Sequence, residues 1–144
     1  MKEEMEITFN WWITCIPDKI NFLKKYIEDF NLNINIVDYS LESLNQLESY
    51  LIENYSIESI KSDEDLFDSI ASYIGTVYKK NIPQSKWFVE LNDTKYIYFN
   101  KPELIVEKLT SFQPHSYITT AIDRKKGDLW STVILKHLNY IDNH

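Results

Sequence analysis

Residues 62–80 read SDEDLFDSIASYIGTVYKK, and their apolar side chains recur at helical spacing on one broad face. Acidic residues stand before the first apolar turn, where they cap a helix and interact with the positive end of its dipole. The width of the apolar face predicts the most buried helix of the protein. Gly75 costs this helix about 1 kcal/mol relative to alanine. Together with Ala71, one turn earlier, it predicts a small-residue patch that another backbone approaches closely.

Other helices are expected on both sides of this segment. Pro17-Asp18 starts one that reaches Phe30, and Ser40 caps a second over residues 41–51. In the second helix a leucine stripe faces the core and the acids face away, namely Glu42, Glu48 and Glu53. Asp128 is predicted to cap a last helix that extends to Ile141. Each of these helices has the amphipathic pattern of a surface helix.

The β-structure is predicted from residues 86–99. Residues 86–91 and 95–99 alternate apolar side chains and are joined by the turn formers Asn92-Asp93-Thr94, which predicts a β-hairpin. Residues 102–112 have helical spacing and end at Pro114, whereas 5–15 and 117–123 fit both a helix and a strand. We therefore expect one α+β domain over 1–144, with amphipathic helices packed on a small antiparallel sheet that contains the hairpin. An irregular helical domain with one hairpin is the alternative.

Charge and composition limit the classes of partner. The net charge is −7, and residues 1–68 contribute −10 while residues 69–144 contribute +3. An acidic half repels phosphates, which argues against nucleic acid, and attracts a basic protein. A single cysteine, Cys15, suits a reducing compartment. Without a signal peptide or a long apolar run, the expected location is the cytoplasm, with no membrane contact.

Motifs for catalysis, cofactors and metals are missing from the sequence. Two glycines are too few for a phosphate-binding loop or a dinucleotide fingerprint, and no His or Cys pair has the spacing of metal ligands. His137 lies on the apolar face of the last helix and is expected to be a core residue with one hydrogen-bond partner. His115 follows Pro114 and is expected at the surface in a loop. We nominate no catalytic, cofactor-binding or metal-binding residue.

The function that fits this composition best is protein binding. Tyrosines supply interface anchors, and acids attract a basic partner. The residues expected to contact such a partner lie in the acidic half: Tyr39, Tyr50, Tyr55, Asp63, Glu64 and Asp65. Two alternatives stay open, together with the oligomeric state. One is an enzyme of an unrecognised kind with Asp123, Arg124 or His137 in a cleft. The other is a structural or regulatory subunit that presents an apolar patch at Trp11 and Trp12.

Three stretches carry a resemblance to a known family. They are Asp38-Tyr39-Ser40-Leu41-Glu42-Ser43-Leu44 followed by Leu47-Glu48; Tyr73-Ile74-Gly75-x-Val77 leading to Trp87; and Ile122-Asp123-Arg124-x-x-Gly127 with Ser131-Thr132-Val133. The chain resembles small uncharacterised bacterial proteins associated with contact-dependent toxin–immunity loci. That resemblance implies an immunity protein that occludes a basic toxin. This chain has Thr76 and Pro83-Gln84 where members carry Gly and Glu, so no site residue is transferred.

Overall fold

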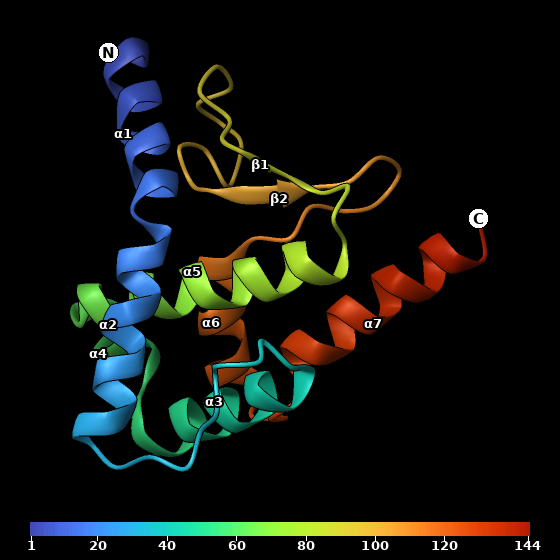
Figure 1. Cartoon of the computed structure of the whole chain (residues 1–144). Helices are drawn as coiled ribbons and strands as arrows, with labels where there is room; N and C mark the ends of the chain where they lie inside the picture. Colours follow the sequence, from blue (N-terminus) through green and yellow to red (C-terminus); the bar gives the residue numbers. More distant parts are fainter.

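The computed structural model describes all 144 residues and is mostly helical, with one small antiparallel sheet (Figure 1). The elements in chain order are α1 (Lys2–Thr14), α2 (Ile16–Asp29), α3 (Leu41–Asn54), α4 (Ile57–Ser62), α5 (Glu64–Asn81), β1 (Lys86–Phe88), β2 (Glu103–Ile105), α6 (Pro114–Arg124) and α7 (Leu129–Asp142). None of the helices is both long and apolar enough to span a lipid bilayer.

Helix α5 crosses the middle of the molecule, with the sheet above it in Figure 1 and α3, α6 and α7 below. Ten of its residues are buried, while no other helix has more than five. Asp63 caps its N-terminus by accepting a hydrogen bond from the Leu66 N–H. The prediction of a most buried helix at this position is therefore confirmed.

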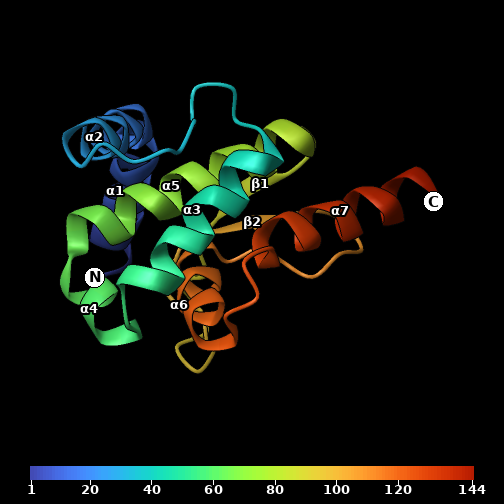
Figure 2. The same cartoon turned by 90° about the horizontal axis from the view of Figure 1, so that it is seen from below.

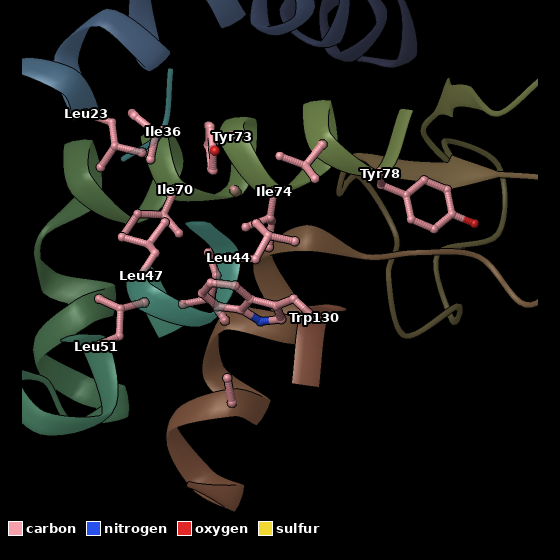
Figure 3. Packing of buried hydrophobic residues seen from close by; sticks show 14 of the residues in the cluster. Leu23, Ile36, Leu44, Leu47, Leu51, Ile70, Tyr73, Ile74, Tyr78 and Trp130 are labelled. Carbon is pink, nitrogen blue, oxygen red and sulfur yellow. The ribbon is translucent and has the colours of Figure 1, made fainter. Parts of the chain in front are cut away.

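The hydrophobic core forms where α3 and α7 come together beneath α5 (Figures 2 and 3). The indole ring of Trp130 is fully buried there, among leucines of α3 and isoleucines of α5. Its N–H donates to the backbone oxygen of Tyr117 at 2.9 Å, so the ring's one polar atom is satisfied. A single cluster of 25 buried apolar residues, from Ile16 to Ile134, draws on every helix except α1 and on strand β2.

The small-residue patch on α5 receives a side chain rather than a backbone. A Cβ atom at position 75 would lie 2.4 Å from Cη2 of Trp87, so the indole ring rests directly against Gly75. The predicted close approach of another backbone is wrong in this respect. The missing Cβ creates space for a large aromatic ring that anchors β1 on α5.

The predicted hairpin at 86–99 is wrong in its second strand. Strand β1 pairs antiparallel with β2, with Trp87 opposite Leu104, and residues 95–99 form turns within the long connection. The predicted helix at 102–112 is also wrong, because Leu104 forms a bridge to Phe112 and both side chains enter the core. Pro114 begins α6 instead of ending a helix. Apolar spacing alone did not distinguish these pairings.

Both segments that fitted two structures are helical. Residues 5–15 lie mainly in α1 and residues 117–123 lie in α6. Helix α1 continues the direction of α2 beyond the helical body and has no buried residue (Figure 1). The short helix α4 was not predicted. It starts with a capping box in which Ser56 and Ser59 exchange hydrogen bonds.

The N-terminus of α7 is capped from a distance by Glu48. This carboxylate accepts hydrogen bonds from the N–H of Leu129 at 2.9 Å and of Trp130 at 3.1 Å, and its side chain is fully buried. The Asp128 side chain makes no capping bond. Two predictions are thereby corrected: Glu48 faces the core rather than solvent, and the cap of the last helix comes from α3.

Candidate functional site

The most developed polar cluster is centred on Asp68 of α5. Its Oδ1 accepts hydrogen bonds from Nε1 of Trp12 and from Nε2 of His115, both at 2.8 Å. Its Oδ2 lies 3.0 Å from the ammonium of Lys19. We call these four residues the Asp68 cluster. It joins α1, α2, α5 and α6 at one point.

Local structure explains why these side chains meet. Trp12 stands in the last turn of α1, and Lys19 lies two turns further along in α2. The Lys19 ammonium also lies 4.2 Å from the centre of the Trp12 ring, in a cation–π contact. His115 is the second residue of α6 because Pro114 fixes the helix start there. Asp68 faces this junction, where the Trp12 and His115 rings lie beside each other with their centres 5.9 Å apart.

The electrostatics keep the carboxylate of Asp68 ionised. Burial by itself raises the pKa of this group, but the hydrogen bonds from His115, Trp12 and Lys19 outweigh it and lower the pKa to about 2. An ionised carboxylate has no proton to donate, so the Nε2 atom of His115 carries the hydrogen of the shared bond. The Nδ1 atom then carries no hydrogen and has no partner within the protein, so it is available as a hydrogen-bond acceptor.

A pocket with a volume of about 460 Å³ opens beside this cluster. Its apolar walls come from aromatic and aliphatic side chains of α1, α5 and the connection before β2: Trp12, Phe67, Ile97, Tyr98 and Pro102. Its polar lining includes Lys61, Lys101, Ser116 and the Asp68–His115 pair. The pocket therefore combines rings with hydrogen-bond donors and positive charge. The sequence predicts no site here, and its prediction of His115 in a surface loop is incorrect because His115 lies in α6.

The chemical capacity of this pocket follows from the His115–Asp68 pair. A carboxylate that orients an imidazole is the arrangement that histidine uses to accept a proton. No hydroxyl or thiol is hydrogen-bonded to His115, and the Thr119 hydroxyl donates to the backbone oxygen of Ser116 instead. As it stands, the geometry can bind and orient a molecule through His115.

The tyrosines predicted to bind a partner separate into two places. Tyr50 and Tyr55 meet Tyr26 of α2, whose hydroxyl oxygen lies 2.7 and 3.0 Å from theirs. Burial, followed by these hydrogen bonds, raises the pKa of Tyr26 well above its usual range. Tyr39 lies elsewhere, stacked on Tyr73. We call Tyr26, Tyr50 and Tyr55 the tyrosine cluster; its Tyr26 member was missed by the sequence analysis.

The predicted acids lie close to this tyrosine cluster. Burial raises the pKa of Tyr55, and the neighbouring charge of Asp63 adds to the shift. Asp63 is half-buried as the cap of α5, while Glu64 and Asp65 are exposed in the first turn of that helix. Glu53 and Glu58 are also exposed, at the end of α3 and in α4. We call these five acids the acidic corner, and Lys61 is the only basic residue between positions 53 and 65.

The residues of the two alternative functions do not form a common site. His137 is buried in the core, where its Nδ1 lies 2.6 Å from the hydroxyl of Tyr78, so its prediction as a core residue with one partner is confirmed. Asp123 and Arg124 are exposed at the end of α6, away from the pocket lining. Trp11 is 67% exposed, whereas Trp12 belongs to the Asp68 cluster, so these two tryptophans point in different directions.

Comparison of the chain with family models, with curated proteins and with solved structures finds no match. The resemblance to toxin–immunity proteins stays a prediction.

Proposed function

We propose that this protein is a non-catalytic binding module that occludes a basic partner through the acidic corner. The observation that supports this proposal is the concentration of five acids around α4, with Lys61 as the only opposing charge. Four of these acids are exposed. They are available to attract a basic surface and to speed its encounter.

The acidic corner stands on a fixed base, which favours binding. The capping box of Ser56 and Ser59 fixes the start of α4, and Asp63 caps α5 directly after it. Beneath them, the hydroxyl groups of the tyrosine cluster join α2 to the end of α3 and to the residue that follows it. A surface that is already ordered loses less conformational entropy when a partner binds.

We further propose that the partner is a basic toxin, which makes the protein an immunity protein that acts in the cytoplasm. Support comes from the resemblance in residues 38–133 and from the charge of the corner. Occlusion requires only a complementary surface, so the proposal needs no catalytic residue in this chain.

The test uses the tagged full-length protein to capture partners at low and high salt from the cells that produce it. A triple variant, Glu58→Gln/Glu64→Gln/Asp65→Asn, removes three exposed charges of the corner and leaves the Asp63 cap in place. The control, Glu3→Gln/Glu4→Gln/Glu6→Gln, removes the same charge from exposed positions of α1. We expect one basic protein to bind the wild type and the control, with about tenfold or greater loss for the corner variant.

The salt dependence gives a second readout. Binding of the captured protein to the wild type should weaken as salt rises, and the corner variant should show a flatter dependence. Equal losses in the corner variant and in the α1 control would show that total charge, not the corner, is responsible. An acidic or uncharged partner whose affinity is unchanged in the corner variant would rule out the proposal.

A further inference from the structure

We infer that the pocket beside the Asp68 cluster binds a small organic anion that carries an aromatic or apolar ring. This site adjoins the acidic corner at Lys61 and would add a small-molecule ligand to a protein-binding module. The inference rests on the charges, the donors and the rings that line this 460 Å³ space.

The charge inside the pocket is opposite to that of the protein as a whole. Lys61 and Lys101 line the pocket, and neither ammonium pairs with a carboxylate. The one acid in the lining, Asp68, is balanced by Lys19 and by its hydrogen bonds to Trp12 and His115. Two unpaired lysines therefore give the lining of the pocket a net positive charge, whereas the chain as a whole carries −7. Such a place attracts an anion.

Further donors stand beside the lysines. The backbone N–H groups of His115 and Ser116 have no acceptor within the protein. Gln113 precedes α6 without capping it, because its side-chain amide donates to Ser111 instead. The Ser116 hydroxyl also lines the pocket and donates no bond within the protein. These groups add directional hydrogen bonds for an anionic head to the charge of the lysines.

The rest of the lining is suited to a ring. Trp12, Phe67 and Tyr98 present aromatic surfaces, and Ile97 is 74% exposed at the rim of the pocket. The volume falls within the range of about 300–1,000 Å³ that is usual for small-molecule pockets. Asp68 holds both Trp12 and His115, so two rings of the lining are fixed before a ligand arrives. Preordered walls lower the entropic cost of binding.

The test is a titration of the ¹⁵N-labelled full-length protein with phenyl phosphate, followed by amide chemical shifts. We expect saturable shifts centred on His115 and Ser116, with a dissociation constant of about 1 mM or tighter. The double variant Lys61→Met/Lys101→Met should weaken binding about tenfold or more, since it removes both unpaired cations. Lys126→Met/Lys136→Met is the matched control, because it removes two exposed lysines outside the pocket lining and should bind as the wild type does.

Two further titrations separate the head from the ring. Phenol should produce no saturable shift, because it lacks the anion. Inorganic phosphate should bind at least about fivefold more weakly than phenyl phosphate, because it leaves the rings uncovered. The inference is overturned if phenyl phosphate causes no saturable shift at His115 and Ser116, if the two lysine double variants bind alike, or if phosphate binds as tightly as phenyl phosphate.

Discussion

Replacing Glu48 with alanine should destabilise the protein far more than any other change of an acid on α3. The wild-type carboxylate lies on α3 and accepts the backbone hydrogens of Leu129 and Trp130, more than eighty residues away, at 2.9 and 3.1 Å. Its side chain is fully buried, so water cannot replace it as the acceptor. The substitution therefore leaves two buried donors without partners at the start of α7.

The size of the effect follows from these two bonds. An orphaned buried donor costs about 1–3 kcal/mol, and the space left by the carboxylate adds to this. Removing the carboxylate also relieves the cost of burying it. Burial raises the pKa of Glu48, although the hydrogen bonds from Leu129 and Trp130 lower it. We expect a net loss of about 3 kcal/mol in the free energy of unfolding. For a chain of this size that corresponds to a fall in Tm of about 6–12 °C.

Thermal and urea unfolding of three variants measure this loss. Glu48→Gln keeps one acceptor oxygen and should lose about half as much stability as Glu48→Ala. Glu53→Ala, at an exposed position of the same helix, should change the stability by less than about 0.5 kcal/mol. If Glu48→Ala melts within about 2 °C of Glu53→Ala, the distant cap does not hold α7 and the reasoning is wrong.

Three more predictions concern the centre of the fold and its buried acids. Gly75→Ala should destabilise the protein by about 1–3 kcal/mol, although alanine has the better helix propensity, because the new methyl group meets the Trp87 ring. In a Trp87→Leu background the same substitution should lower the free energy of unfolding much less, which a double-mutant cycle of urea unfolding measures. The pKa of Asp68 is lowered to about 2 from 3.8, so the stability that its carboxylate gives the folded protein is complete above pH 4 and is lost as the pH falls toward 2. The variant Asp68→Asn should therefore lower the free energy of unfolding by about 1–2 kcal/mol at pH 6 and by almost nothing at pH 2. Urea unfolding at both pH values measures this difference. Glu103 is buried and its Oε1 accepts hydrogen bonds from the Tyr96 and Ser111 hydroxyls, so Glu103→Leu should lower the Tm by leaving both donors without this acceptor, and an unchanged Tm would show that these bonds are not needed.

The sequence predicted those parts of the fold that depend on local chemistry. The Ser40 cap and the broad apolar face of α5 could be recognised because their signals lie within a few neighbouring residues. The β-pairing failed because Leu104 and Phe112 have the spacing of a helix, while their bridge depends on the position of β1. Alternation in residues 95–99 resembles a strand, but the Tyr96 hydroxyl instead donates to Glu103.

The candidate site was harder to predict than the fold. Asp68 binds Trp12 and His115, which are 56 and 47 residues away in the sequence, so no spacing rule connects them. The one available signal was Pro114, because a proline begins helices as readily as it follows them. A helix that begins at Pro114 would have placed His115 in its first turn. Three acids of the corner, Asp63, Glu64 and Asp65, were easier to nominate because they are consecutive in the sequence, whereas Glu53 and Glu58 were not predicted.

Helix α1 has no buried residue, and its hold on the body depends largely on the last turn, where Trp12 reaches Asp68. Because so little of α1 is buried, we expect this helix to open at a lower free energy than the core helices. Such a partial opening would take the indole wall away from the pocket and release one of the three groups that keep Asp68 acidic. Trp12 is therefore the one point at which α1 contributes to the pocket, so the state of the last turn of this helix decides whether that wall is present.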